Sequence, residues 1–403
     1  MRESYSQKKA VLDNIKSEYI SAVNNYMKQD YSIVVYGAGM YGMKICQMLR
    51  NNNIPIAAIG VTNIKYNRDK MFGIRVHTID ELVNRRQKYV YLLAIKPSAQ
   101  KILEDEMNSR GVNSYIKLPK YAEELFDETF FRPVIEITPR IGCSVNCHFC
   151  PQELFLRTYN KLNRDCKKEM SIDDFKYYVD KTPEDCIIDF SGFVEPFLAH
   201  DGVEMIKYAY EKGRDIRLFT TLVGLTLEGF KQIEDIPFKF VVLHIPDVKK
   251  YANIPLTKEY FEILQYVILK KKKDGMPFVD MANCQAEPNP DVVKLIENRF
   301  PISWQLIDRA GNLEGDELQS VVANENNIYC TRALNMNHNV LLPNGDLLLC
   351  CMDFGMKRVL GNLKSQDYEE VLRGITMGKV IEENKNEGDL LCRKCVYAQS
   401  FDI

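Results

Sequence analysis

The sequence predicts an α/β protein in which a partial parallel barrel of six β/α units follows a smaller parallel-sheet domain. Three observations predict it. A glycine-rich turn joins an early predicted strand to a helix, six later strands alternate with helices, and seven of the twelve cysteines gather in groups. From about residue 321 short strands surround spaced cysteines, which predicts a small α+β domain.

The charge balance and the apolar runs exclude several classes of partner. Lys and Arg number 53 and Asp and Glu 55, a net charge of −2 that gives no reason to expect nucleic acid or an anionic membrane surface. No run approaches the ~18 apolar residues of a membrane helix, and no signal peptide precedes the first helix. We therefore expect a cytoplasmic protein with no nucleic-acid or membrane partner, whose cysteines are not mainly in disulfides.

The first predicted elements are an amphipathic helix and a glycine-rich turn. Apolar residues recur at three- and four-residue steps within 4–28, which places them on one helix face. A short apolar strand, 31–36, then runs into Gly37, Gly39 and Gly42 and a further helix. This order is typical of folds whose glycine-rich turn holds a phosphate at a helix N-terminus.

The second strand of this region, Ile54–Val61, ends without the acidic residue that NAD sites use. We therefore predict a helix over 1–28 and a Rossmann-like domain over 29–120 with a candidate phosphate site at its glycines. A tight turn without a ligand, or a docking module, is the alternative. The other elements predicted here are helix Ile79–Gln87 and strands Tyr89–Ala94 and Ile116–Leu118.

The barrel is predicted over residues 130–320. Its strands are Val134–Thr138, Cys186–Phe190, Ile216–Thr220, Phe240–Ile245, Phe278–Ala282 and Ile302–Leu306. In such barrels the functional residues follow the C-terminal ends of the strands. The segment Asp308–Gly311, after the sixth strand, is one such position for contacts with a substrate.

Cys143, Cys147 and Cys150 follow the first barrel strand with the spacing C-x₃-C-x₂-C. A structural zinc site closes its coordination with four ligands. Three thiolates suit three corners of a [4Fe–4S] cluster and leave one iron without a protein ligand. Unrelated cysteines, or a zinc loop completed by His148, are the alternatives.

With Phe149 as its aromatic residue, this loop resembles the C-x₃-C-x-aromatic-C motif of the radical S-adenosylmethionine (SAM) superfamily, whose fold is a partial (β/α)₆ barrel. The resemblance implies SAM and a SAM-binding [4Fe–4S] cluster as cofactors, and a flavodoxin or ferredoxin-type reductant. It implies reductive cleavage of SAM to a 5′-deoxyadenosyl radical that abstracts hydrogen from the substrate.

The resemblance also assigns residues to SAM. Glu195 and Pro196 match the glycine-glutamate-proline motif after the second strand, which holds the SAM amino group, whereas Val194 stands where a glycine is usual. The residues assigned in this way are Phe149, Gly192, Glu195, Pro196, Thr220, Thr221 and His244.

Four later cysteines, Cys330, Cys350, Cys392 and Cys395, are enough to ligate one more cluster completely. Their arrangement resembles the SPASM/twitch extension of radical SAM enzymes, and we place that domain at 321–403 with one auxiliary [4Fe–4S] cluster. A four-cysteine zinc site is the alternative, and Cys351 is an alternative ligand to Cys350.

A completely ligated second cluster suits electron acceptance, which predicts a net oxidation, although epimerisation and rearrangement stay open. The Rossmann-like domain favours a small polar substrate such as a sugar, a cyclitol or a nucleotide-linked sugar. A peptide-modifying maturase is the alternative of the same fold. A non-catalytic iron–sulfur protein for electron transfer or binding is the alternative of another class.

Overall fold

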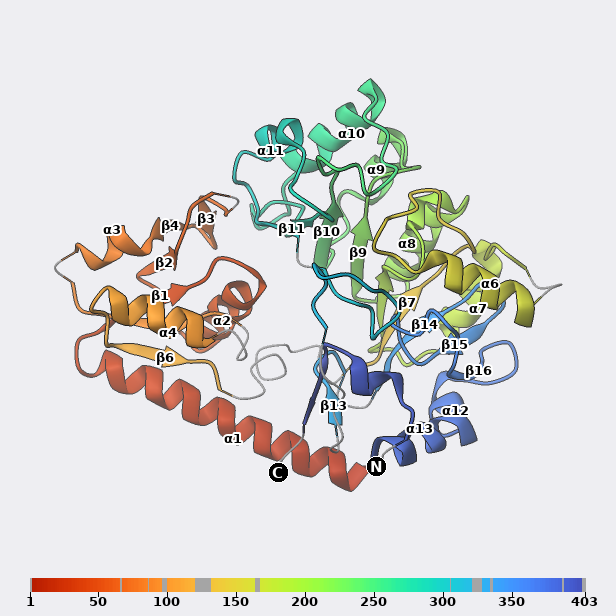
Figure 1. Ribbon diagram of the computed structural model, residues 1–403, viewed down its shortest axis with the longest axis horizontal. Helices are drawn as coiled ribbons and strands as arrows, with labels where there is room; N and C mark the ends of the chain where they lie inside the picture. Colours follow the sequence, from red (N-terminus) through yellow and green to blue (C-terminus); the bar gives the residue numbers. More distant parts are fainter. Residues whose placement is uncertain are drawn as a thin grey trace. The chain divides into compact units, whose positions relative to one another are not determined.

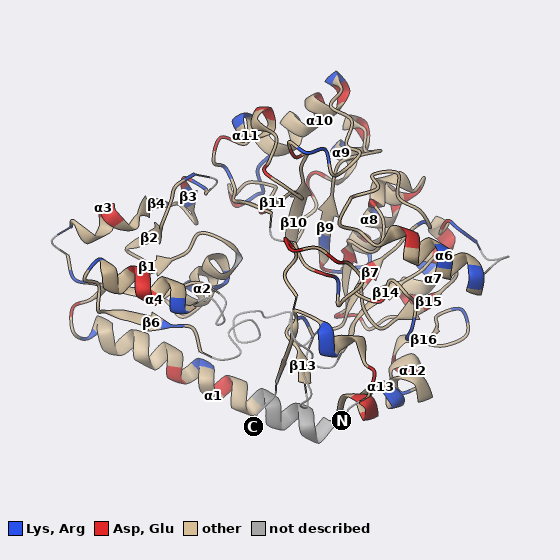
Figure 2. Cartoon of the chain, viewed as in Figure 1, with Lys and Arg blue, Asp and Glu red and all other residues tan. Residues whose placement is uncertain are grey.

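The computed structural model describes residues 2–65, 67–85, 87–95, 100–119, 132–163, 167–304, 306–320, 328–333, 336–385 and 388–400. The chain divides into two compact units, Met1–Phe130 with Ile296–Pro301, and Phe131–Leu295 with Ile302–Ile403. None of the helices in the described ranges is long and apolar enough to cross a membrane. Basic and acidic side chains are interspersed along both units (Figure 2).

The first unit is built on a six-stranded sheet with the order β3-β4-β2-β1-β5-β6 (Figure 1). All its pairings are parallel except that of β3 with β4. The chain adds strands first on one side of β1 and then on the other, which is the Rossmann-like order. The strands are β1 (Ser32–Tyr36), β2 (Ala58–Val61), β3 (Lys70–Met71), β4 (Ile74–Thr78), β5 (Tyr89–Leu93) and β6 (Tyr115–Lys117), and the helices are α1 (Arg2–Met27), α2 (Met40–Asn51), α3 (Ile79–Val83) and α4 (Gln100–Ser109).

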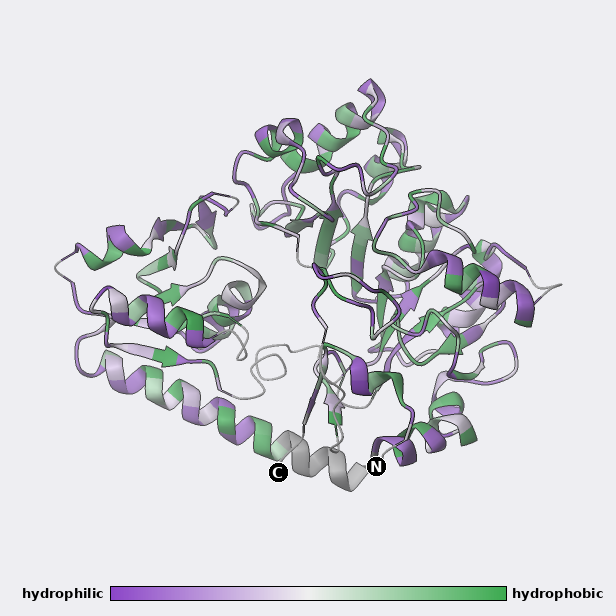
Figure 3. Cartoon of the chain, in the orientation of Figure 1, coloured by the Kyte–Doolittle hydropathy of each residue, from purple (hydrophilic) through white to green (hydrophobic). Residues whose placement is uncertain are grey.

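Helix α1 is amphipathic, as its sequence predicts. Leu12, Tyr19 and Val23 are buried on one face, which packs on β1. Hydrophilic and hydrophobic residues alternate along the helix in Figure 3, whereas β9 and β10 of the second unit are mainly hydrophobic. The helix is therefore held by burial of one stripe of side chains.

Two predicted elements of this unit are shorter in the structure. The strand expected at Ile54–Val61 is ordered as β2 only from Ala58, because Pro55 has no amide N–H to donate to a sheet. The helix expected at Ile79–Gln87 ends at Val83. Thr78 caps its start by accepting a hydrogen bond from the Glu81 amide.

The second unit is an open nine-stranded sheet with the order β12-β11-β10-β9-β8-β7-β14-β15-β16. The six strands from β7 to β12 run parallel and alternate with helices, which confirms the predicted partial β/α barrel. These strands are β7 (Val134–Ile137), β8 (Ile187–Phe190), β9 (Ile216–Thr220), β10 (Phe240–His244), β11 (Met281–Asn283) and β12 (Ile302–Ser303).

The helices of this unit begin at recognisable caps. Ser171, Thr226 and Thr257 each accept a hydrogen bond from the amide three residues later. Neighbouring helices α7, α8 and α9 then pack on one another along the sheet (Figure 1). The helices are α6 (Gln152–Leu162), α7 (Ile172–Asp180), α8 (Gly202–Glu211), α9 (Leu227–Ile233), α10 (Lys258–Leu269), α11 (Pro290–Ile296), α12 (Tyr368–Leu372) and α13 (Ile375–Lys385), with 3₁₀ turns η2 (Pro196–Leu198) and η3 (Leu391–Lys394).

The fifth and sixth barrel strands differ from the predicted ranges. Phe278, expected in a strand, precedes β11 and packs its ring against Phe230 and Phe238. Its apolar character therefore reflects core packing outside the sheet. Strand β12 covers only the first two of the five residues expected, of which residue 305 lies outside the described ranges.

The C-terminal strands extend the barrel sheet, which the sequence analysis did not predict. Strand β14 (His338–Leu341) pairs in parallel with β7, and β15 (Asp346–Leu348) and β16 (Val359–Asn362) continue the sheet in antiparallel order. Strands β13 (Ile328–Cys330) and β17 (Ala398–Ser400) form a separate antiparallel pair. Cys350, which follows β15, is thus connected through β14 to β7, the strand before the first cysteine loop.

The barrel sheet has a polar face opposite its helices. Phe190 contacts Phe175 of α7, so Asp189, one residue earlier, points away from that helix. Asp189 is in register with Glu136 of β7 and Arg217 of β9, and all three side chains therefore share one side of the sheet. We call this side the inner face.

We predict that Gly42→Ala destabilises the first unit. A Cβ at Gly42 would collide with the backbone carbonyl of Gly37, and overpacking of this kind costs about 1–3 kcal/mol. Chemical denaturation of the full chain, followed by fluorescence, should show an earlier first transition. Gly39→Ala is the matched control, because a Cβ there meets nothing within 4 Å. Equal midpoints for the two variants would contradict the packing argument.

Candidate active site

The cysteine loop of Cys143, Cys147 and Cys150 lies between β7 and α6. Its two turns are closed by hydrogen bonds from the Asn146 amide to the Cys143 carbonyl (3.3 Å) and from the Cys150 amide to the Cys147 carbonyl (3.1 Å). Burial raises the pKa of Cys147 to about 12, and its neighbours Cys150 and Cys143 raise it further. The structure thus groups the three thiols. Without a bound metal centre, the protein favours their neutral form.

Two later loops hold the cysteine loop in place. The Asn253 amide donates to the Val145 carbonyl (2.7 Å), and the Phe149 amide donates to Gln285 Oε1 (3.0 Å). The His148 ring stacks on Tyr251 with centroids 4.6 Å apart. The loops that follow β10 and β11 therefore fix the conformation of the loop that follows β7.

Glu195 lies directly against this loop. Its backbone amide hydrogen-bonds to the Cys143 sulfur, and its buried carboxylate accepts hydrogen bonds from Thr220 Oγ1 (2.7 Å), Thr221 N (2.6 Å) and Thr221 Oγ1 (2.8 Å). Burial raises the pKa of Glu195 to about 7, against the opposing effect of the threonines. The structure therefore brings together Glu195, Thr220 and Thr221, and Pro196 begins η2 next to them.

Gly192 and Val194 have packing roles in this loop. A Cβ at Gly192 would collide with the Ile137 carbonyl and the Thr138 hydroxyl, because the Phe193 amide donates to Thr138 Oγ1 at 3.0 Å. Val194 is buried. The close approach of backbone to backbone therefore occurs at Gly192, two residues before the position where the family has its glycine.

His244 ends β10 near a cation that follows β12. Burial lowers the pKa of His244 to about 4, and Arg309 lowers it further, so the imidazole is neutral at pH 7. Arg309 also lowers the pKa values of Cys147 and Cys150, although burial dominates both. Its positive charge is thus oriented toward the first cysteine loop.

The four C-terminal cysteines line a single cavity. Cys330 comes from β13, Cys350 follows β15, Cys392 lies within η3, and Cys395 directly follows η3. Burial raises the pKa of Cys395 to about 12, and Cys330 raises it further. The pKa of Cys350 is raised by burial and by its cysteine neighbours, Cys392 and Cys395 among them. The structure therefore assembles the four cysteines that the sequence analysis grouped.

Cys351 lines the same cavity but has different partners. Arg332 Nη1 lies 2.8 Å from its sulfur, and Glu136 also hydrogen-bonds to it. Burial raises the pKa of Cys351 to about 12, while the Arg332 charge opposes this rise. The neighbouring Cys350 is influenced mainly by burial and by the other cysteines of the cavity, so we keep Cys350 as the proposed cluster ligand.

The donor chemistry of both cysteine groups fits iron–sulfur clusters. Buried thiols become thiolates only when a positive centre compensates the charge, and clusters are held by thiolates. Within the described ranges, no group of three or more Cys, His, Asp or Glu side chains is placed to hold a metal ion. The ligand assignments therefore rest on which cysteines lie together, and they stay predictions.

Close packing requires glycine at two of the three glycine positions in the turn of the first unit. Gly37 has φ +134°, and a Cβ there would lie 2.7 Å from the Ala94 carbonyl. Gly42 packs against the Gly37 carbonyl. Gly39 precedes α2 as its cap and has no neighbour where its Cβ would be. Close packing of the turn thus explains Gly37 and Gly42, and a phosphate at this turn stays a prediction.

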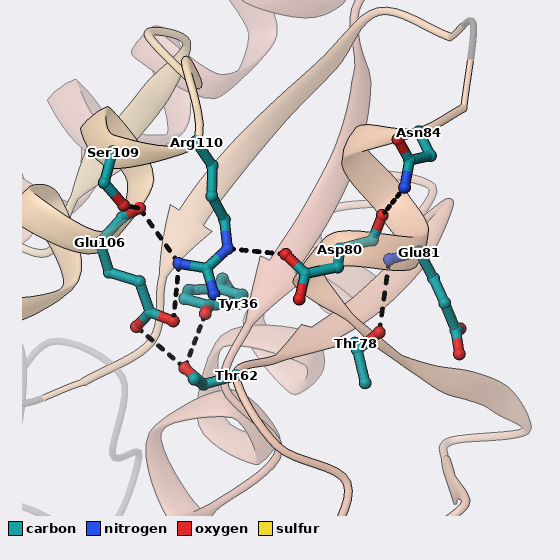
Figure 4. A network of polar contacts seen from close by, with 9 residues as sticks. All are labelled: Tyr36, Thr62, Thr78, Asp80, Glu81, Asn84, Glu106, Ser109 and Arg110. Carbon is teal, nitrogen blue, oxygen red and sulfur yellow. Dashed lines mark hydrogen bonds and ion pairs between the residues drawn. The ribbon is translucent and has the colours of Figure 1, made fainter.

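A network of polar contacts occupies the end of β2, the position where NAD sites carry their acid (Figure 4). Tyr36 Oη and Thr62 Oγ1 are 2.8 Å apart, and Thr62 Oγ1 donates to Glu106 Oε2 at 3.0 Å. Arg110 joins Glu106 to Asp80 through contacts of 3.2 and 2.8 Å. These side chains contact one another at the end of β2.

The sequence analysis missed a buried charged group on the inner face. Glu136 accepts from Arg332 Nη2 at 2.9 Å and lies 2.8 Å from His338 Nε2, and Asp189 is fully buried beside it. The sequence does contain a feature that could have revealed this group. Each of two otherwise apolar strands, VIEI and IIDF, carries a single carboxylate. A charge at such a position is costly unless it has a function or a partner.

Comparison with known proteins gives one family match and several structural ones. Residues 330–396 match the SPASM iron–sulfur cluster-binding domain. Among solved structures, BtrN in complex with AdoMet and 2-DOIA is 16% identical, with a TM-score of 0.42 over 63% of this chain and 87% of that one. SuiB of Streptococcus suis bound to S-adenosylmethionine is 13% identical (TM-score 0.41, 72% and 79%), and anSMEcpe with AdoMet and a Cp18Cys peptide is 14% identical (0.38, 66% and 86%). No curated protein matches the chain.

We predict that the two cysteine groups hold separate clusters. Anaerobic reconstitution should give about eight irons per chain. Alanine at Cys143, Cys147 and Cys150 together should leave about four irons, measured by colorimetric iron assay and Mössbauer spectroscopy. Cys284→Ala is the control, because Cys284 is buried and its thiol donates to the Ala286 carbonyl at 3.0 Å. A triple variant that retains all its iron would refute the assignment.

Proposed function

We propose that this chain, whose residues 330–396 match the SPASM domain, is a radical SAM enzyme that oxidises a C–H bond of a small polar molecule such as a sugar, a cyclitol or a nucleotide-linked sugar. Its cofactors are SAM and [4Fe–4S] clusters. The observation that carries the proposal is the contact of Glu195 with Cys143, which joins a buried carboxylate to the cysteine loop at one end of the barrel strands.

The residues proposed to hold the cofactors are those that the structure groups. Cys143, Cys147 and Cys150 would hold the SAM-binding cluster, and Glu195 would accept hydrogen bonds from the SAM amino group. When bound and reduced, this pair of cofactors supplies one-electron cleavage of SAM and hydrogen abstraction. Phe149, Gly192, Pro196, Thr220, Thr221 and His244 complete the proposed site.

Glu195 is suited to this role by its surroundings. Thr220 and Thr221 hold both of its carboxylate oxygens, so the side chain is oriented before SAM arrives. Because burial raises its pKa to about 7, part of the population is protonated at neutral pH. Raising the pH through 7 increases the ionised fraction, which is the better hydrogen-bond acceptor.

The remaining features favour oxidation of a polar substrate. The inner face carries Glu136, Asp189 and Arg217, which suit hydroxyl or amino groups better than apolar ones. The cavity with Cys330, Cys350, Cys392 and Cys395 would hold the auxiliary cluster, which suits electron acceptance. A flavodoxin or ferredoxin-type protein would supply the first electron.

The direct test measures 5′-deoxyadenosine made by the anaerobically reconstituted enzyme with SAM and dithionite. We expect at least one of myo-inositol, glucosamine and UDP-glucose to raise its formation about tenfold and to be recovered with two hydrogens fewer. A rise with a cysteine-containing peptide alone would identify a peptide maturase instead. No cleavage of SAM under any condition would contradict the proposal.

Glu195→Gln should weaken equilibrium SAM binding by about 10- to 100-fold, because a buried charged hydrogen bond contributes about 1–3 kcal/mol. The loss should be largest above pH 7, where the carboxylate of the parent enzyme is ionised. Glu184→Gln is the matched control, since Glu184 is exposed in the loop before β8. Unchanged SAM affinity in Glu195→Gln would exclude Glu195 from the SAM site.

A further inference from the structure

Asp189 is a buried carboxylate whose oxygens lack ordinary hydrogen bonds. It lies in β8 with an exposed fraction of 0%, and neither Oδ1 nor Oδ2 has a partner of hydrogen-bond geometry among the described residues. The nearby Ser191 hydroxyl favours its ionised form only in part. Buried polar groups are nearly always paired in folded proteins, so an orphaned carboxylate requires an explanation.

The face on which Asp189 lies is partly exposed on the neighbouring strand β9. Along β9, Arg217 and Phe219 are partly exposed, whereas Ile216 and Leu218 between them are buried. Asp189 is in register with Arg217, so it shares the more open side of the sheet. The inner face is therefore partly open at β9, beside the buried Asp189 of β8.

The charged groups around Asp189 come from every strand beside it. Glu136 of β7 is its neighbour in register, Arg217 lies on β9, Arg332 follows β13, and His338 starts β14. Burial lowers the pKa of His338 to about 4, as does Arg332, so His338 is neutral. Two buried carboxylates thus lie near two partly exposed guanidinium groups.

The two carboxylates have opposite environments. Burial opposes ionisation of Glu136, but Arg332 and His338 outweigh it and hold its pKa well below the usual range. Burial and then the charge of Glu136 raise the pKa of Asp189 to about 6, against the opposing charges of Arg217 and Arg332. Paired acids whose pKa values are pushed apart divide into a fixed charge and a group that exchanges protons.

The same cluster borders the C-terminal cysteine cavity. Arg332 and His338 line that cavity together with Cys351, and both contact Glu136. Glu136 in turn lies beside Asp189. A short chain of contacts therefore connects Asp189 to the proposed auxiliary site.

We propose that Asp189 is the proton acceptor of this enzyme and that its substrates carry a hydroxyl or amino group on the carbon that is oxidised. The inference rests on the proposed function. After the C–H hydrogen has left with the deoxyadenosyl group, the O–H or N–H bond breaks and its proton passes to an Asp189 carboxylate oxygen. A C=O or C=N double bond forms, and the remaining electron goes to a one-electron acceptor of the iron–sulfur class.

The first test needs no substrate. ¹³C NMR of aspartate-labelled, reconstituted enzyme with oxidised clusters should show one carboxyl that titrates with a midpoint near pH 6. The resonance should be absent in Asp189→Asn and present in Asp185→Asn, whose carboxylate is exposed four residues earlier. Glu136→Gln should move the midpoint downward. A midpoint near pH 4 for Asp189 would overturn the inference.

The second test separates proton transfer from SAM cleavage. With whichever of myo-inositol, glucosamine and UDP-glucose the parent enzyme oxidises, Asp189→Asn should form deoxyadenosine within about twofold of the parent rate. Oxidised product should fall by at least about 100-fold, as for loss of a general base. Full coupling of product to deoxyadenosine in Asp189→Asn would overturn the inference. If the parent oxidises none of the three, the proposed substrate class fails, while the titration still tests Asp189.

Discussion

The constraint on which the rest of this structure depends is the gathering of seven thiols, each buried or partly buried, in two groups. Burial raises the pKa of each thiol whose pKa shift is resolved, including Cys147 and Cys395, so that the protein alone favours neutral sulfur. A positively charged metal centre reverses that preference, since it binds thiolate. The loops around Cys143 are held by hydrogen bonds from Asn253 and to Gln285, which position the sulfurs before a cluster is assembled. The fold therefore positions the sulfur atoms of each site, and the positive charge of iron would stabilise them as thiolates.

The sheet relates the two sites through one strand. Strand β7 leads into the first cysteine loop and carries Glu136, while β14 pairs with β7 and carries His338. Glu136 is thus held by residues from the C-terminal region. On the next strand, the carboxylate oxygens of Asp189 have no hydrogen-bond partner among the described residues, although the charges of Arg217 and Arg332 act on it. This asymmetry gives the inner face one fixed charge and one group that can exchange a proton, which is what an oxidation needs beside an electron acceptor.

The sequence predicts those parts of the fold that are encoded by a pattern of neighbouring residues. Alternating strands and helices predicted the parallel sheets, and the spacing of Cys143, Cys147 and Cys150 predicted their grouping. The addition of β14 to β7 has no local signal, because pairing between strands about 200 residues apart depends on the whole sheet. The prediction that Phe278 begins a strand was wrong, because its apolar side chain packs in the core before β11 starts. Asp189 and Glu136 were overlooked because register between strands, which is a tertiary property, makes them neighbours.

The central claim is that three thiolates leave one iron open for SAM. Electron–nuclear double resonance of the reduced enzyme with ¹⁵N-labelled SAM tests it most directly. We predict a hyperfine coupling between the methionine nitrogen and one cluster, lost when Cys143, Cys147 and Cys150 are replaced by alanine. An enzyme that holds zinc in this loop, or a reduced cluster without coupling to the labelled nitrogen, would contradict the account.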